Sequence, residues 1–328
     1  MAKLNDEFSL IAKYFAPLSA EGSFGLKDDA ALFTPKEGNS VVVTQDALAS
    51  GVHFFPDDPP ALIAKKALRV NISDLASKGA KPKSFSLALG LSDETDENWV
   101  SEFAQGLGED CKNYDISLSG GDTFNSNAGL VISITAFGEI PEIEYTSRLG
   151  GKTGQHVYVT GTIGDAALGL LARQKKLSGL ATQHQEFLIN RYLLPEPRTA
   201  MCSAIRQFAS SAMDISDGLV ADLEKLCEAS SVSAQLNLPE VPLSKAAREA
   251  VSLESSLLEV AVSGGDDYEI LFSVDPDNVD AFRNAAEECG VEVTCIAELV
   301  EGNGSVSVID ETGKQINLKA SGFNHFGA

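Results

Sequence analysis

Strand-like and helix-like segments alternate in both halves of this sequence, and that alternation limits the fold more than any other feature. Val41–Thr44 is a β-branched run that predicts a buried strand, with the carboxylate of Asp46 at its C-terminal end. Pro59 and Pro60 favour a helix start, and the stretch from there to about Lys78 has the spacing of one long helix. The same patterns predict a first helix through Phe8, Ile11, Phe15 and Leu18, strands at 84–89, 130–137, 156–160, 269–274 and 292–297, helices at 97–114, 165–175 and 278–289, and a hairpin at 303–318. Such alternation indicates an α/β or α+β fold rather than an all-helical or all-strand protein.

The chain has 328 residues, which is enough for two domains of ordinary size. A new alternation of strands and helices begins after the Gly150–Gly151 turn. We therefore place a domain boundary near residue 150, with an N-terminal domain at 1–150 and a C-terminal α/β domain at 151–328.

The chain is strongly acidic, with 47 aspartates and glutamates against 25 lysines and arginines and a formal net charge of −22. This charge repels phosphate backbones and anionic lipids, so it argues against nucleic acid and membranes as partners. The acidity is explained either by solubility alone or by carboxylates that cluster to hold divalent cations, which would let an acidic protein accept a nucleotide. Composition leaves both explanations open.

Cysteine usage and hydropathy point to the cytoplasm. The five cysteines are scattered, form no CxxC pair and are odd in number, as expected for reduced thiols. Apolar stretches such as 130–137 are far shorter than the roughly 20 residues that a membrane-spanning helix needs. We therefore expect a soluble, cytoplasmic protein.

One tetrapeptide occurs twice, as Ser119–Asp122 and as Ser263–Asp266, once in each predicted domain. A Gly–Gly pair permits left-handed or tightly turned backbone that exposes N–H groups, and the aspartate that follows offers oxygen to a cation. Two ordinary glycine turns are the alternative, and the sequence leaves it open.

Carboxylates next to small or turn-forming residues are the candidate metal ligands, because Mg²⁺ takes one or two carboxylates together with substrate phosphates and water. These carboxylates are Asp28, Asp29, Asp46, Asp74, Asp122, Asp214, Asp217, Asp266 and Asp267. Asp74 shares a helix face with Asn71 and Ala67, so it is either partly buried with a partner or a surface carboxylate. For the adjacent Asp28 and Asp29, exposure to solvent and metal binding are the two alternatives.

The segment Asp214–Leu219 precedes a predicted helix that runs to about Ala229. Ser216 and Asp217 are suited to capping that helix. Asp214 adds a negative charge that capping does not need, and a helix N-terminus also supplies N–H donors for a phosphate. The segment is therefore either a helix cap or a phosphate and metal site.

The common nucleotide-binding and hydrolase motifs are absent from the sequence. The chain has no GxGxxG, no protein-kinase catalytic loop, no HExxH and no GxSxG. Gly151–Thr153 resembles the end of a P-loop, but Thr146 stands where the upstream glycine is required. If the protein binds ATP, metal-rich loops must hold it.

The ordered set of these segments resembles the thiamine-monophosphate kinase family, which is related to aminoimidazole ribonucleotide synthetase and selenophosphate synthetase. The segments cover nearly the whole chain and are Gly25–Leu32, Thr44–Asp46 with Gly51–Phe54, Val70–Ala76, Gly120–Thr123, Asp214–Leu219, Ser263–Glu269 and Gly322–Phe326. The resemblance implies N-terminal domains that pair across a homodimer to close a barrel-like sheet, each beside a C-terminal α/β domain. It also implies that ATP and thiamine monophosphate are the substrates and that several Mg²⁺ ions are bound.

The resemblance implies roles for individual residues. The implied metal ligands are Asp29, Thr44, Asp46, Asp74, Asp122, Asp214 and Asp217. The implied ATP contacts are Gly121, Asp122, Arg148 and Ser216, the implied thiamine-monophosphate contacts are His53, Asp266 and Phe323, and Asp46, Asp122 and Arg148 are expected to be catalytic. Three positions depart from the family's usual pattern, with Gln45 in place of a second hydroxyl residue, Asp266 in place of Glu and Phe323 in place of Trp.

The implied reaction is in-line transfer of the ATP γ-phosphate to the phosphate of thiamine monophosphate. That phosphate is mostly dianionic near neutrality, because its second pKa is roughly 6, so the reaction requires no general base. The alternatives are another ATP-dependent enzyme of the superfamily, acting on a purine precursor or on selenide, and a non-catalytic nucleotide- or cation-binding relative. A selenide enzyme would carry a reactive cysteine near its N-terminus, whereas the first cysteine here is Cys111.

Overall fold

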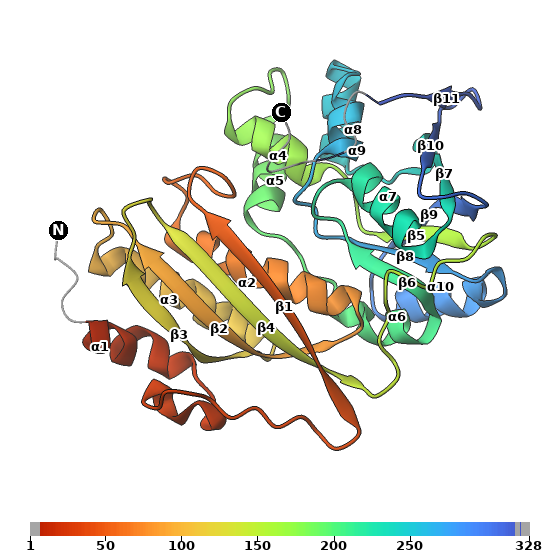
Figure 1. Ribbon diagram of the computed structural model, residues 1–328. Coiled ribbons are helices and arrows are strands. Elements are labelled where there is room, and N and C mark those ends of the chain that lie inside the picture. Colours follow the sequence, from red (N-terminus) through yellow and green to blue (C-terminus); the bar gives the residue numbers. More distant parts are fainter. Residues whose placement is uncertain (1–6, 319–321, 323–328) are drawn as a thin grey trace. The chain divides into compact units, whose positions relative to one another are not determined.

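The protein folds into two compact units in a computed structural model that describes residues 7–318 and Gly322. The first unit runs to Leu75 and resumes over Ala80–Ile143, and the second takes Ala76–Gly79 and the chain from Glu144 onward. Each unit combines one sheet with helices (Figure 1). The chain is therefore an α/β protein of two units.

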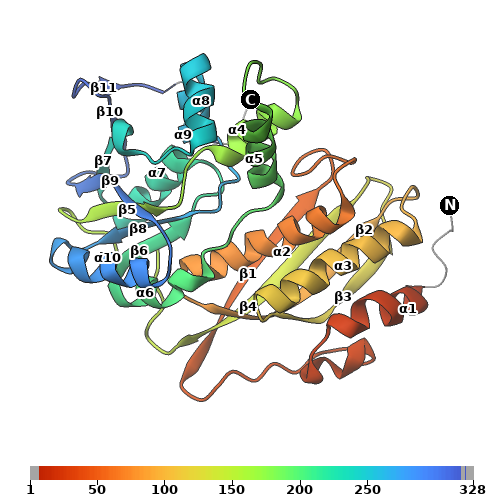
Figure 2. The ribbon, with the colours of Figure 1, turned by 180° about the vertical axis from the view of Figure 1, so that it is seen from behind.

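A four-stranded sheet forms the first unit, in the order β1-β4-β2-β3. Its strands are β1 (Asn39–Ala49), β2 (Lys81–Leu91), β3 (Ser117–Asn125) and β4 (Val131–Pro141). β4 pairs antiparallel with β1 and β2, whereas β2 and β3 are parallel. The helices α2 (Pro60–Ser77) and α3 (Glu97–Asn113) lie across one face of this sheet (Figure 2). The four strands form an open sheet and do not close into a barrel among the described residues.

A buried ion pair fixes α2 against α3. Arg69 on α2 donates from Nε and Nη2 to the two carboxylate oxygens of Asp110 on α3, at 2.6 and 2.9 Å. Asp110 is fully buried, so loss of Arg69 would leave an unpaired buried charge, which costs about 3–5 kcal/mol.

Asp96 is the N-cap of α3, because its side chain accepts a hydrogen bond from the N–H group of Trp99 at 2.9 Å.

The first predicted helix is not one continuous α-helix. The chain forms a short α-helix, α1 (Glu7–Leu10), then a π turn at Ile11–Phe15 and a 3₁₀ turn at Ala16–Leu18. Pro17 lacks an N–H group, so the α-helical hydrogen-bond pattern does not continue through it.

The strand predicted at Val41–Thr44 is longer and more exposed than expected. It lies at the edge of the sheet as β1, and the side chain of Val43 is 56% exposed. Asp46 therefore lies within the strand and not at its C-terminal end, and the prediction of a buried strand is wrong. The helices predicted at 59–78 and 97–114 are confirmed as α2 and α3.

A seven-stranded sheet forms the second unit, in the order β11-β10-β7-β9-β5-β8-β6. Its strands are β5 (His156–Thr160), β6 (Ala209–Asp214), β7 (Ser233–Asn237), β8 (Ile270–Val274), β9 (Val293–Val300), β10 (Val306–Ile309) and β11 (Gln315–Ile316). Its helices are α4 (Asp165–Arg173), α5 (Thr182–Leu193), α6 (Cys202–Phe208), α7 (Leu219–Ser230), α8 (Lys245–Leu253), α9 (Leu257–Ser263) and α10 (Val279–Glu288). Side chains alternate between the two faces of β5, since Val157 and Val159 pack with α7 whereas Tyr158 packs with α6 and α10.

Most elements predicted for this unit are confirmed, including the terminal hairpin of β10 and β11. The sequence pattern does not predict β6 and β7, because small polar residues interrupt the apolar residues of both strands. In β6 the buried hydroxyl group of Ser211 is hydrogen-bonded to that of Ser273 on β8, at 2.8 Å. Among the described residues, no helix combines the length and the apolar character needed to cross a membrane.

Candidate functional site

Two groups of predicted ligands form in the first unit, and the first joins β1 to α2. The Thr44 hydroxyl group on β1 donates a hydrogen bond to Asp74 on α2. The buried side chain of Asn71 accepts one from the Asp46 N–H group at 3.1 Å and donates one to the Ala67 carbonyl at 3.0 Å. Asp74 is therefore half-buried with a partner and is not a free surface carboxylate.

The second group surrounds a cavity of about 130 Å³ beside β3. Asp28 and Asp29 line this cavity together with Gly121 and Asp122, which lie some ninety residues later in the chain. A side chain at Gly121 has no room, because a Cβ atom there would lie 1.9 Å from the carbonyl oxygen of Leu87. Three carboxylates therefore lie beside a segment of bare backbone, an arrangement that suits a cation with a phosphate.

The two groups lie at opposite edges of the four-stranded sheet, one at β1 and the other at β3. The register places Asp46, Ile134, Leu87 and Gly121 in one line across β1, β4, β2 and β3. Three strand spacings of about 4.8 Å separate Asp46 from Gly121, which is roughly 14 Å. No three Asp, Glu, His or Cys side chains converge on one metal position in the described part of the chain. The first group offers two carboxylates, and the second offers three that do not converge on one position. Mg²⁺ takes one or two carboxylates when phosphates and water complete its shell.

His53 follows β1, in the connection to α2. Its ring nitrogen Nδ1 accepts a hydrogen bond from the Ala49 N–H group at 3.0 Å, and its carbonyl accepts one from Lys66 Nζ at 3.1 Å. In the neutral ring the proton therefore lies on Nε2, which makes that nitrogen a donor.

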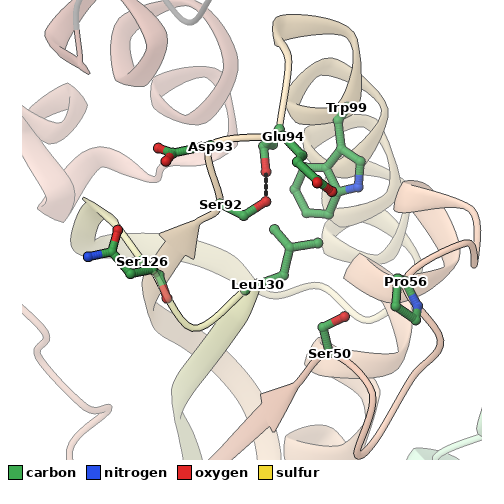
Figure 3. Close-up of a pocket in the computed structure, with 11 residues that line it drawn as sticks. Ser50, Pro56, Ser92, Asp93, Glu94, Trp99, Ser126 and Leu130 are labelled. Atoms are coloured by element: carbon green, nitrogen blue, oxygen red, sulfur yellow. Dashed lines mark hydrogen bonds between the residues drawn. The ribbon is translucent and has the colours of Figure 1, made fainter.

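A larger cavity of about 550 Å³ lies where the connections that follow β1, β2 and β3 meet (Figure 3). Figure 3 shows Leu130 projecting toward Glu94 and Trp99. The Ser92 and Thr95 hydroxyl groups are hydrogen-bonded at 3.1 Å. None of the predicted ligands lines this cavity, and its lining residues include carboxylates but no Lys, Arg or His. Asp29, Gly121 and Asp122 line the smaller cavity and not this one, so the smaller cavity is the candidate phosphate site.

In the second unit, two loops are hydrogen-bonded along their length. Ser216 O accepts from the Asp266 N–H group at 2.9 Å, and Ile215 O accepts from the Tyr268 N–H group at 2.8 Å. A Cβ atom at Gly265 would lie 2.2 Å from the Ser216 carbonyl oxygen, so only glycine permits this contact. The structure thus brings together the segment around Asp214 and Asp217 and the second copy of the repeated tetrapeptide.

The two copies of the tetrapeptide differ from the predicted turns. The first copy lies inside β3, and none of its glycines or those of the second copy has a positive φ. Their glycines serve close backbone approach, as at Gly121 and Gly265, and not left-handed conformation. The left-handed residues are instead Asp266, with φ of 75°, and Tyr268, with φ of 52°.

Asp222 on α7 holds the loop that contains Ser216 and Asp217. Its carboxylate is fully buried and accepts hydrogen bonds from the N–H groups of both residues, each at 2.9 Å. Burial raises the pKa of Asp222, and an ion pair with Lys225 at 2.7 Å partly offsets that effect. Lys225 also pairs with Asp217. These two N–H groups are therefore already used within the protein. The N-cap of α7 is Gly218 and no side chain caps the helix, which corrects the expectation that Ser216 and Asp217 cap it.

Asp214 ends β6, and the segment that carries Arg148 runs beside that strand. The Ala212 N–H group donates to the Ser147 carbonyl at 3.1 Å, and Ser230 donates to the Arg148 carbonyl at 2.8 Å. The Arg148 side chain is exposed and forms no ion pair with the described residues. The guanidinium group is thus available to an anion.

Phe323 lies outside the described residues, but its neighbour Gly322 is described. A Cβ atom at Gly322 would lie 2.8 Å from the Asp217 carbonyl oxygen and 2.3 Å from the Ala221 Cβ atom. The chain immediately before Phe323 therefore contacts the start of α7.

Sequence reasoning missed a buried charge network behind Asp266. The Asp267 carboxylate accepts hydrogen bonds from the N–H groups of Gly164 at 2.6 Å and Ala166 at 3.1 Å, at the start of α4. Burial raises the pKa of Asp267 well above its usual value. The next buried carboxylate, Glu269, accepts from Thr160 at 2.6 Å, from Arg191 at 2.8 Å and from Arg198 at 2.7 Å. The sequence does carry one signal of this network, the adjoining acids Asp266 and Asp267 between an apolar helix and an apolar strand. Carboxylates in such a place are expected to be buried, and buried carboxylates require partners.

The chain matches the family models of the AIR synthase related protein, N-terminal domain, over residues 27–140, and C-terminal domain, over residues 152–310. It is 41% identical over 303 residues to the thiamine-monophosphate kinase of Caulobacter vibrioides, covering 91% of this chain and 85% of that protein. A crystal structure of thiamine-monophosphate kinase from Stenotrophomonas maltophilia has a TM-score of 0.80 and 36% identity, over 89% of this chain and 91% of the other. A structure of AaThiL complexed with AMPPCP and TMP has a TM-score of 0.78 and 28% identity, over 98% and 94% of the two chains. Identity at this level over nearly the whole of both sequences establishes that this chain belongs to the thiamine-monophosphate kinase family.

Proposed function

We propose that this chain transfers the γ-phosphate of ATP to thiamine monophosphate, giving thiamine diphosphate and ADP. A phosphate oxygen of thiamine monophosphate forms a bond to the γ-phosphorus, and the bond from that phosphorus to the bridging oxygen of ADP breaks. The observation that carries the proposal is the cavity beside β3, where Asp28, Asp29 and Asp122 meet the backbone of Gly121 and no histidine or lysine lines the wall. With Mg²⁺ on these carboxylates such a site would neutralise and align phosphates, and a dianionic phosphate nucleophile needs no proton removed.

We assign the binding of Mg²⁺ to three sets of oxygen ligands. These are Thr44, Asp46 and Asp74 between β1 and α2, Asp29 and Asp122 beside β3, and Asp214 and Asp217 at the end of β6. Each set supplies hard oxygen atoms in the number that leaves room for phosphate and water, which supports Mg²⁺ over a metal that needs an all-protein cage. The ions would lower the repulsion between the two anionic substrates.

We assign ATP to Gly121, Asp122, Arg148 and Ser216. Gly121 and Asp122 line the cavity beside β3, and the exposed Arg148 guanidinium group supports this assignment because a guanidinium group pairs with two phosphate oxygens at once. The Ser216 hydroxyl group remains a possible donor, although its N–H group is bound to Asp222.

We assign thiamine monophosphate to His53, Asp266 and Phe323. His53 has a donor at Nε2, and Asp266 offers a carboxylate to the amino group or the positive ring of thiamine. The structure of AaThiL complexed with AMPPCP and TMP supports the choice of substrates, since AMPPCP is an ATP analogue.

We propose that the N-terminal sheets of two chains pair to close a barrel. The face of the four-stranded sheet opposite α2 and α3 carries exposed apolar side chains on β1, where Val41 is 39% and Val43 is 56% exposed. A second copy of this chain would bury these side chains and pair the exposed edge of β1.

The reaction is tested by incubating the protein with ATP, Mg²⁺ and thiamine monophosphate and separating the products chromatographically. Thiamine diphosphate and ADP in equal amounts, both lost when EDTA is added, are the expected result. ADP formation without thiamine diphosphate would assign the chain to another reaction of the superfamily. Absence of any ATP turnover would make it a non-catalytic relative.

A further inference from the structure

The loop that carries Asp266 has a strained backbone. Asp266 and Tyr268 both have left-handed φ values, 75° and 52°, and neither is a glycine. Such residues persist only where the surrounding structure holds them in place, and they concentrate at functional sites. Asp267 lies between them.

The Asp267 carboxylate attaches this strained loop to a rigid element. Only 2% of the residue is exposed, and its two oxygens accept the N–H groups of Gly164 and Ala166. Those groups begin α4 and have no partner within the helix, so the carboxylate satisfies donors that would otherwise be buried without one. One side chain therefore joins the start of α4 to the middle of the loop.

The residues on either side of Asp267 are held from other directions. The Asp266 and Tyr268 N–H groups donate to the backbone around Ser216, as described above. Glu269 is bound by Arg191 and Arg198. The conformation of the loop thus depends on three attachments. The Tyr268 hydroxyl group also donates to Asp266 Oδ1 at 3.4 Å within the loop, whereas Asp267 is the neighbour of Asp266 that ties the loop to α4.

We propose that Asp267 is a positioning residue that sets the place of the Asp266 carboxylate toward thiamine monophosphate. The inference rests on the proposed function, since it takes Asp266 to accept the cationic or amino part of that substrate. Asp267 itself is buried and does not touch the substrate. Replacing Asp267 therefore weakens the binding of thiamine monophosphate. The bound phosphates stay aligned, so the rate of the chemical step is kept.

The test compares Asp267→Asn with the matched control Asp165→Asn. Asparagine at position 267 keeps one oxygen acceptor. Its amide NH₂ group faces the N–H group of Gly164 or Ala166, so two donors meet and one of the two hydrogen bonds is lost. Asp165 is equally buried at the start of the same helix, but its carboxylate bonds to Thr162 and Ser244, both at 2.5 Å, and not to the loop.

We expect Asp267→Asn to raise KM for thiamine monophosphate about tenfold, with kcat and KM for ATP within about twofold of wild type. Asp165→Asn should lower the melting temperature comparably without that change in KM. Hydrogen exchange at residues 264–268 should quicken only in Asp267→Asn. Asp267→Ser, which is small and keeps a hydroxyl acceptor, is assayed alongside and carries the comparison if the asparagine variant does not fold.

Equal KM values in the two asparagine variants, or unchanged exchange at 264–268, would overturn the inference. Failure of the wild-type protein to make thiamine diphosphate would instead overturn the proposed function. The exchange measurement needs no turnover, so it still reports whether Asp267 holds the loop.

Discussion

Replacing Gly121 with alanine tests how closely β2 and β3 must approach beside the proposed phosphate site. A Cβ atom at Gly121 would lie 1.9 Å from the Leu87 carbonyl oxygen, whereas real Cβ contacts are essentially never shorter than 3.0 Å. The two strands must therefore separate by about 1 Å, which disturbs their pairing next to Asp122. Overpacking of this kind costs about 1–3 kcal/mol. At about 2–4 °C per kcal/mol for a unit of this size, the melting temperature should fall by roughly 2–12 °C.

Gly120→Ala is the matched control, because it adds the same methyl group one residue earlier on the same strand. A Cβ atom at Gly120 has nothing within 4 Å, and φ is not positive at either glycine. The melting temperature of Gly120→Ala should stay the same or rise, since alanine restricts the unfolded chain and so stabilises the folded protein by about 0.4–1 kcal/mol. Scanning calorimetry measures both variants, and titration calorimetry with Mg²⁺ and ATP should show weaker binding for Gly121→Ala. Equal melting temperatures for the two variants would refute the steric argument.

Three further predictions concern the carboxylates. Asp46→Asn and Asp122→Asn should each reduce kcat at least about a hundredfold, with unchanged circular dichroism, because each removes a negative ligand charge from a proposed Mg²⁺ position; near-normal turnover in both would contradict the metal assignment. Lys225→Met should tighten the binding of Mn²⁺, followed by electron paramagnetic resonance, because Lys225 competes with a cation for Asp217; weaker or unchanged binding would show that Lys225 does not compete. Burial raises the pKa of Asp165 above its ordinary 3.8. At pH values between 3.8 and the raised pKa, the native protein therefore binds more protons than the unfolded chain, and its stability falls as the pH rises through this interval. In melting curves recorded from about pH 4 to 7, Asp165→Asn should reduce this loss of stability with rising pH. An unchanged dependence of the melting temperature on pH would assign the loss to other groups.

Elements with a strong apolar period could be predicted from sequence, and those fixed by tertiary contacts could not. The long helix α2 has a proline start and helical spacing, and the structure confirms it. Two adjacent glycines are locally permissive, so the sequence predicts turned backbone for the first copy of the repeated tetrapeptide. Its true conformation, a strand, depends on pairing with Leu87, which lies more than thirty residues away and leaves no local signal.

The same distinction applies to the candidate site. The sequence leaves Asp74 either partly buried with a partner or on the surface, and its contact with Thr44 decides for the first. The roles of Asp222 and Asp267 were not foreseen, because each depends on which distant N–H groups reach its carboxylate. Burial and hydrogen-bond partners belong to the folded chain, so a count of acids along the sequence does not separate ligands from residues that hold loops.

The cations built into the protein indicate which proposed Mg²⁺ positions bind more tightly. Asp217 already has Lys225 as a partner, so an ion there must share or displace a positive charge. Asp28, Asp29 and Asp122 line their cavity with no Lys, Arg or His among the lining residues, so a cation from solution displaces no positive charge of the lining there. The position beside β3 should therefore fill first as Mg²⁺ is added, and the position at Asp217 should fill only when the phosphates of ATP bring further negative charge. If Asp217→Asn weakened the binding of Mn²⁺ in the absence of nucleotide more than Asp122→Asn did, this order of filling would be wrong.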